Sequence, residues 1–233
     1  LGSAVFHPDA SRIARTASGG RYGFSQSLFQ VGGNTGTALG PVLAAFIVLE
    51  FGQPSIVWFG LLAVAAMVVL WRVGNWARAR HMAARQAGSP AAPAGPISRK
   101  ALWLLAILGA LMFSKFIYMT CLSSFYTFYL IETFGVSVRT SQLLLFVFLG
   151  AMAVGTFLGG PIGDRYGRRL VITVSILGVL PFTVALPFVG LWEVAVLTGL
   201  IGLINGSAFA AILVYGQSLL PGRVGMVSGL FFG

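Results

Sequence analysis

Long runs without a charged residue dominate the chain. A charge near the centre of a bilayer costs at least about 2.5 kcal/mol on insertion scales, so each run predicts a helix that can cross a membrane. Five of these runs are 22–49, 51–71, 140–163, 170–192 and 194–222, and 101–131 contains a single charge, Lys115, so the pattern predicts six full spans. Apolar stretches at 1–6 and 224–233 predict pieces of two more helices. We therefore expect a bundle that is incomplete at both ends.

Composition supports an all-α membrane protein. Of the 233 residues, 57% are hydrophobic and 9% are charged, whereas about 25% of residues are charged in an ordinary soluble domain. A soluble globule is therefore excluded.

The basic residues mark the expected orientation. All but two of the 15 Lys and Arg residues fall in alternate loops, within 12–21, 72–100 and 165–169 and at Arg223; the exceptions are Lys115 and Arg139. Short loops rich in Lys and Arg stay in the cytoplasm. The net charge of +10 is thus explained by topology, and we expect no nucleic-acid partner.

A change in composition divides the chain. Residues 73–100 are rich in Ala, Arg, Gly and Pro, and Pro90, Pro93 and Pro96 prevent a continuous helix there. We interpret 73–100 as a basic cytoplasmic linker between parts of two helix bundles, 1–72 and 101–233. A short repeat agrees with this division, because residues 20–23 (GRYG) match residues 222–225 (GRVG) at the entry to a span.

The most specific motif lies at 160–169 and reads G-x-x-x-D-R-x-G-R-R. Its glycines permit a tight turn and close helix approach, and Asp164 can pair with an Arg or a helix N-terminus in one conformation and release it in another. The motif resembles the signature loop of the major facilitator superfamily. The resemblance implies a major facilitator-type helical bundle and a gate latch; the alternative is that the arginines only enforce topology. The latch residues would be Gly160, Asp164, Arg165, Gly167, Arg168 and Arg169.

This resemblance assigns numbers to the helices. The signature loop would join helices eight and nine, so residues 1–72 would hold the end of helix four with helices five and six. Residues 101–233 would then hold helices seven to ten and the start of helix eleven.

Helix five has two chemically different faces. Gly32, Gly36 and Gly40 recur every four residues and predict close packing. Polar residues lie on another side and can line a cavity: Gln26, Gln30, Asn34 and Thr37.

The same helix carries a second family motif. Gly36, Gly40 and Pro41 resemble the G-x-x-x-G-P motif of drug/proton antiporters, although Ala44 and Ala45 stand where that family usually has glycines. Ordinary small-residue packing is the alternative. Further small-residue stripes predict packing seams in helices eight and ten: Ala151, Gly155, Gly159 and Gly163, and Gly202, Gly206 and Ala210.

Lys115 is a cation on the order of 20 Å into its predicted span. Tyr118, Tyr126 and Tyr129 share its helical face, and a cation with hydroxyl donors suits an oxygen-rich anion. We predict substrate contacts from Lys115, Tyr118 and Tyr126, together with Gln26, Gln30 and Asn34 of helix five. The alternative for Lys115 is a structural pair with a carboxylate on a helix outside the chain.

The proton carrier is less defined, because no Asp or Glu lies in the middle of a predicted span. His7 and Asp9 are candidates, since His titrates near neutral pH. Alternatively, the His7-Pro8-Asp9 segment ends its helix and caps the next turn. The sequence has no metal-type His/Cys cluster, no phosphate-binding Gly-Lys loop and no nucleophile beside a base. We therefore expect no enzyme, metal or cofactor.

Four segments narrow the resemblance to bacterial fosmidomycin-resistance efflux proteins: 2–12, 113–119 with 123–130, 178–183 and 219–229. The resemblance implies proton-driven export of a small anionic drug from a multi-pass protein of the bacterial cytoplasmic (inner) membrane. The expected partners are lipid, protons and the anionic substrate, and we expect a monomer. An importer of a small anionic metabolite and a non-transporting membrane sensor are the alternatives.

Overall fold

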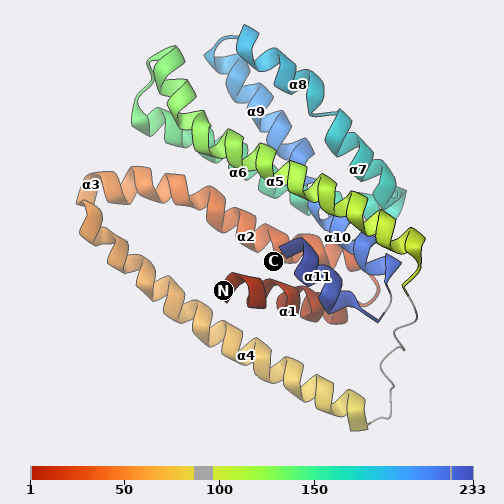
Figure 1. The fold of residues 1–233 in the computed structure, drawn as a ribbon. Coiled ribbons are helices and arrows are strands. Elements are labelled where there is room, and N and C mark those ends of the chain that lie inside the picture. Colours follow the sequence, from red (N-terminus) through yellow and green to blue (C-terminus); the bar gives the residue numbers. More distant parts are fainter. Residues whose placement is uncertain (1, 87–96, 221, 233) are drawn as a thin grey trace.

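The structure is a computed structural model that describes residues 2–86, 97–220 and 222–232 (Figure 1). The described residues form helices and turns and contain no strand. The α-helices are α1 (Gly2–Ala17), α2 (Tyr22–Leu43), α3 (Leu49–Phe51), α4 (Phe59–Gln86), α5 (Arg99–Phe134), α6 (Val138–Tyr166), α7 (Arg168–Leu177), α8 (Leu180–Ala185), α9 (Leu191–Gly206), α10 (Ala208–Leu219) and α11 (Val224–Phe232). A π-helical turn (Ala44–Val48) and two 3-10 helices (Gln53–Trp58 and Leu186–Phe188) complete the path.

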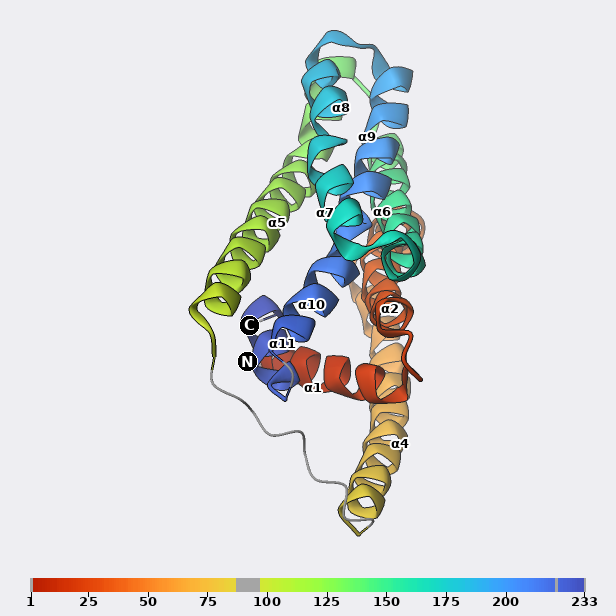
Figure 2. The ribbon, with the colours of Figure 1, turned by 90° about the vertical axis from the view of Figure 1, so that its right-hand side faces the viewer.

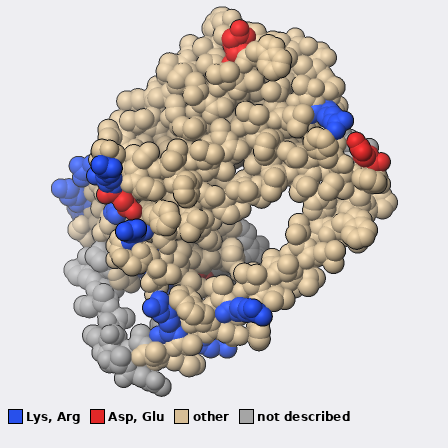
Figure 3. All heavy atoms as spheres, turned by 180° about the vertical axis from the view of Figure 1, so that it is seen from behind, with Lys and Arg blue, Asp and Glu red and all other residues tan. Residues whose placement is uncertain are grey.

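Six described segments are long and apolar enough to cross a membrane, which confirms the six predicted spans. Their bounds are Tyr22–Val48, Gln53–Arg80, Arg99–Phe134, Val138–Tyr166, Arg168–Phe188 and Leu191–Leu219. On the face drawn in Figure 3, most Lys and Arg lie at the left and bottom edges, with one acidic residue among those at the left. A surface without charges separates them from the acidic residues at the top and right, where a single basic residue also lies (Figure 3). This arrangement matches the charge pattern of the loops.

The helix at the N-terminal end continues through its proline. α1 contains Pro8 and ends only at Ala17, so the expectation that His7-Pro8-Asp9 ends this helix is wrong. A single proline removes one backbone hydrogen bond, and the helix reforms beyond it. The chain then turns at Gly19 and Gly20, whose φ angles of 57° and 94° are accessible to glycine at little cost.

The predicted linker is partly helical. α4 continues to Gln86 because Ala, Arg and Met are good helix formers. α5 begins at Arg99, where the Ser98 hydroxyl accepts a hydrogen bond from the backbone N–H of Ala101. The three prolines on which the linker prediction rests lie outside the described residues.

Two predicted spans are interrupted. The span at 170–192 breaks at Gly178 and Val179, between α7 and α8 and shortly before Pro181, which cannot donate a backbone hydrogen bond. The span at 194–222 breaks at Ser207. There the hydroxyl of Thr156 lies 3.2 Å from the carbonyl oxygen of Gly206.

Glycines bring α6 and α9 into close contact. A Cβ atom at Gly155 or Gly159 would collide with the backbone of Leu203 or Ser207, and one at Gly202 or Gly206 with the backbone of Phe148 or Met152. The two predicted small-residue seams therefore face each other, which confirms their packing role. α6 also packs along α2, while α1 packs against α11 (Figures 1 and 2).

Candidate functional site

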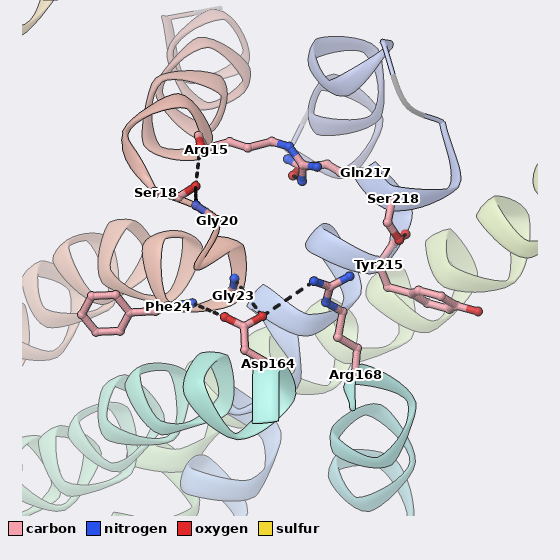
Figure 4. Close-up of polar contacts among 10 residues, drawn as sticks. All are labelled: Arg15, Ser18, Gly20, Gly23, Phe24, Asp164, Arg168, Tyr215, Gln217 and Ser218. Atoms are coloured by element: carbon pink, nitrogen blue, oxygen red, sulfur yellow. Dashed lines mark hydrogen bonds and ion pairs between the residues drawn. The ribbon is translucent and has the colours of Figure 1, made fainter. Parts of the chain in front are cut away.

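The signature loop holds the start of α2. The carboxylate of Asp164, near the end of α6, accepts hydrogen bonds from the backbone N–H groups of Gly23 (3.2 Å) and Phe24 (3.1 Å) (Figure 4). It also lies 3.7 Å from the guanidinium of Arg168. A helix N-terminus has unpaired N–H groups and a partial positive charge. Asp164 therefore contacts both kinds of partner predicted for it, an arginine and a helix N-terminus, at the same time.

Glycines make this contact possible. A Cβ atom at Gly160 would overlap the Ser27 hydroxyl and the Gly23 carbonyl, and one at Gly23 would lie 2.5 Å from Oδ1 of Asp164. Gly167 has a φ of 98° at the turn between α6 and α7, a conformation that favours glycine.

The remaining arginines of the loop have separate partners. The guanidinium of Arg165 lies over the ring of Tyr166, 5.3 Å from its centroid. Arg169 donates a hydrogen bond to the Tyr215 hydroxyl of α10 at 3.2 Å. The loop thus contacts α2 on one side and α10 on the other.

A buried polar cluster joins four helices near the same end of the molecule. We define it as Ser11 of α1, Gln26 of α2, Gln217 of α10 and Ser228 of α11, all of them fully buried. Gln26 donates to the Ser11 carbonyl (2.7 Å) and accepts from the Ser11 hydroxyl (3.1 Å). Gln217 donates to the hydroxyls of Ser11 (3.2 Å) and Ser228 (3.0 Å). Gln26, predicted as a substrate contact, thus has both amide atoms engaged inside this cluster.

Arg15 extends the polar cluster towards the surface. Its guanidinium donates to the side-chain carbonyl of Gln217 at 2.8 Å (Figure 4) and lies 4.1 Å from the centroid of the Tyr22 ring. Burial lowers the pKa of this guanidinium from its ordinary value. No local sequence pattern predicts this cluster, because its outermost members, Ser11 and Ser228, lie 217 positions apart.

The polar face and the glycine face of α2, the predicted helix five, have different surroundings. On the polar face, Asn34 donates to the Thr156 hydroxyl of α6 at 2.8 Å, and the buried side-chain nitrogen of Gln30 has no hydrogen-bond partner among the described residues. A Cβ atom at Gly32, Gly36 or Gly40 would meet no described atom within 4 Å. Within the described residues the polar face therefore packs and the glycine face is open, so close packing of the glycine face stays a prediction.

Lys115 is 5% exposed, and its side chain reaches α7, the first part of the interrupted span at 170–192. Its Nζ lies 3.2 Å from the Ser175 hydroxyl and 3.4 Å from the Ser175 carbonyl oxygen. Ser175 belongs to the last turn of α7, where helical carbonyls lack partners and a cation is favourable. The described residues provide no carboxylate for Lys115, so both of its hydrogen-bond partners there are neutral. The sequence feature that points to this contact is Pro181, because a proline predicts a break in the helix and therefore unpaired carbonyl groups.

The tyrosines of α5 line a separate cavity of about 410 Å³ between α5, α8 and α9. The Tyr118 hydroxyl bonds Thr183 at 2.7 Å, and the Tyr126 hydroxyl bonds Thr198 at 2.9 Å. The structure thus brings Tyr118, Tyr126 and Tyr129 together, while Lys115 lies outside this lining. The other lining residues are Cys121, Leu122, Phe125, Leu186, Pro187 and Val194.

The two candidate coupling residues have different surroundings. His7 lies among aromatic rings, with centroid distances of 5.5 Å to Phe6, 6.0 Å to Phe29 and 5.2 Å to Phe232. Asp9 forms an exposed ion pair with Arg12 at 3.5 Å. His7 is therefore at the junction of α1, α2 and α11, whereas Asp9 is at the surface of α1. No group of three or more His, Cys, Asp and Glu that could hold a metal occurs among the described residues.

Comparison with known proteins identifies the family. The sequence pattern of the Major Facilitator Superfamily matches residues 1–233. The chain belongs to the Major Facilitator Superfamily. Membership in this superfamily agrees with the membrane-length helices and with the signature loop at 160–169, and the chain forms part of such a helical bundle.

Two relatives match the whole chain. It is 54% identical over 234 residues to the "Fosmidomycin resistance protein" of Escherichia coli (strain K12), of which it covers 57%. It is 41% identical over 236 residues to the "Uncharacterized MFS-type transporter YfnC" of Bacillus subtilis (strain 168), of which it covers 58%. The chain therefore spans less than two thirds of the length of these relatives. No solved structure matches it.

Proposed function

We propose that this chain is part of a proton-coupled exporter of fosmidomycin or a similar small anionic drug. The observation that carries the proposal is the 54% identity, over the whole chain, to a protein named for fosmidomycin resistance. In this proposal residues 1–72 and 101–233 belong to two bundles that rock about a site near the bilayer midplane, and the protein lies in the bacterial cytoplasmic membrane.

Lys115 supplies the charge that selects an anion. Its ammonium is buried, and its hydrogen bonds run only to neutral oxygens of Ser175. A buried cation with neutral partners leaves a positive potential in a medium of low dielectric constant. A phosphonate or another anion would satisfy this potential better than a serine hydroxyl, because charge-assisted hydrogen bonds are the stronger ones.

Polar groups from both parts of the chain complete the proposed path. Tyr118 and Tyr126 border the cavity of α5, and Gln30 and Asn34 lie on the polar face of α2. Gln26 becomes free for substrate only when the polar cluster opens. His7, among aromatic rings contributed by three helices, is the proposed site of proton coupling, with Asp9 as its neighbour on α1.

The signature loop and the polar cluster act as the cytoplasmic gate. Asp164 ties the start of α2 to α6 and α7, and the cluster ties α1 and α2 to α10 and α11. These contacts close the basic side of the bundle. Opening that side to load drug requires them to separate, and a separated Asp164 would be solvated by water.

The test is fosmidomycin accumulation in drug-sensitive bacteria that express the full-length protein, with and without a protonophore. We expect lower accumulation only while the proton gradient stands. Lys115→Ala should abolish this effect, while Lys100→Ala, which removes the chain's other lysine at the exposed start of α5, should leave it unchanged at equal membrane abundance.

The other outcomes exclude the proposal in distinct ways. Increased accumulation would identify an importer, and unchanged accumulation would favour a sensor without transport. Export that survives Lys115→Ala would retain the function but remove Lys115 from the substrate site.

A further inference from the structure

A cleft between α1 and α4 gathers three arginines on the basic side of the molecule. Its lining consists of Arg12, Ile13 and Thr16 from α1 and Trp76, Ala77, Arg78 and Arg80 from α4, and its volume is about 490 Å³. No acidic residue is among the lining residues. The cleft takes no part in the proposed substrate path, which runs through α2 and α5.

The cleft lies at the level of the lipid headgroups. The charge-free run of this helix ends at Trp71, just before Arg72, and a tryptophan near the end of a span settles at the membrane–water interface. Trp76 is such a residue, and its side chain is exposed. The three guanidinium groups therefore lie where the phosphates of the adjacent leaflet are found.

Little negative charge in the chain opposes these arginines. Asp9 lies 3.5 Å from Arg12, with both side chains more than half exposed, and an exposed pair of this kind is weak because solvent screens it. Neither Arg78 nor Arg80 forms an ion pair with a described carboxylate. The sequence from 81 to 100 contains no Asp or Glu, so the segment that follows α4 offers no counter-charge.

One guanidinium is already oriented. The Cζ atom of Arg80 lies 5.1 Å from the centroid of the Trp76 ring, a cation–π distance. A planar guanidinium held in this way retains free N–H groups that match two phosphate oxygens. Above it, the exposed apolar surface of α4, including Val69 and Val73, can accommodate acyl chains.

We propose that this cleft binds the headgroup phosphate of an anionic phospholipid from the cytoplasmic leaflet. A basic pocket between membrane helices on the cytoplasmic side is the arrangement that recognises such headgroups. The apolar surface that continues from the cleft along α4 favours a lipid over free phosphate, which lacks acyl chains.

The test uses the purified full-length protein and measures bound lipid by native mass spectrometry. Phosphatidylglycerol is the anionic probe, and phosphatidylcholine is the zwitterionic control. We expect selective retention of phosphatidylglycerol, and about fivefold weaker binding for each of Arg78→Gln and Arg80→Gln. Arg72→Gln is the matched control, because Arg72 is an exposed arginine of the same helix outside the cleft; it should change binding less than twofold.

Two further arms make the outcomes decisive. Arg80→Lys keeps the charge but loses the planar fork, so it should bind more weakly than the parent protein and more tightly than Arg80→Gln. Inorganic phosphate at millimolar concentration should not displace the lipid. Equal retention of both lipids, an equal loss in Arg72→Gln, or displacement by phosphate would each overturn the proposal, and none of these results depends on drug transport.

Discussion

Asp164 and Gly23 meet at the first turn of α2, where the backbone nitrogen of Gly23 lies 3.2 Å from Oδ1 of Asp164. The approach is so close that a Cβ atom on Gly23 would lie 2.5 Å from the same oxygen. The contact joins a residue before the linker to one after it. Its strength therefore bears on how firmly the two parts of the chain are held together on the basic side.

Gly23→Ala should loosen this contact, because the added methyl group occupies the place of the carboxylate. A charge at a helix N-terminus contributes up to about 1 kcal/mol, so we expect up to about a fivefold shift towards the open state. Spin labels at Thr16 of α1 and Ser218 of α10, both exposed, would report longer distances in the full-length protein.

The matched control for this experiment is Gly33→Ala. It lies on the same helix, and its Cβ atom would meet no described atom within 4 Å. If the two alanine variants gave the same distance distribution, the contact between Asp164 and Gly23 would not hold the basic side closed.

Asp164→Asn and Arg168→Gln separate the two contacts of the latch. Asn keeps the size of Asp but loses the charge that the α2 N-terminus stabilises. The ion pair with Arg168 is longer, at 3.7 Å, and both side chains are about one quarter exposed, so its loss costs less. We expect transport to fall more in Asp164→Asn than in Arg168→Gln, as measured by initial rates at equal protein abundance. The reverse order would show that the ion pair, and not the helix terminus, is the main partner of Asp164.

Gln217→Leu tests the polar cluster. The change leaves Arg15 and the hydroxyls of Ser11 and Ser228 without the amide that connects them. A buried polar group left without its partner costs about 1–3 kcal/mol. We expect a lower thermal unfolding midpoint and longer distances between the labels at Thr16 and Ser218.

Gln53→Leu is the control for that substitution, because Gln53 is exposed and precedes α4 at the other end of the bundle. An equal loss of stability in both variants would assign the effect to the removal of any glutamine. A normal midpoint in Gln217→Leu would show that the cluster contributes little to closure.

The part of the site that the sequence predicted is the part encoded by local spacing. Asp164 was recognised because glycines and arginines surround it at fixed intervals, and both of its predicted kinds of partner are present. The glycines of α6 and α9 were likewise visible as repeats with a spacing of four residues. Periodicity predicts which residues share a helix face, and here it identified two faces that meet.

The missed contacts depend on tertiary structure. Lys115 bonds Ser175 because the helix breaks between α7 and α8, before Pro181, and presents a carbonyl group. A proline inside an apolar run indicates a break, but it does not identify the side chain that approaches the break. The polar cluster joins residues as far apart as Ser11 and Ser228, and each is an isolated serine in its own segment. The glycine face of α2 stays a prediction, because small-residue spacing indicates that a face can pack, and not which neighbour it packs against.

Gly155→Ala tests the seam between α6 and α9. The new Cβ atom would collide with the carbonyl oxygen of Leu203, and because that oxygen belongs to a helix backbone, the helices must separate. Overpacking of this kind costs about 1–3 kcal/mol, so the unfolding midpoint in detergent should fall. Gly150→Ala lies on the same helix with its nearest atom 4.0 Å away; there alanine should stabilise the helix by up to about 1 kcal/mol. The two substitutions should therefore act in opposite directions, and a fall of equal size in both would show that α6 and α9 are not held together at Gly155.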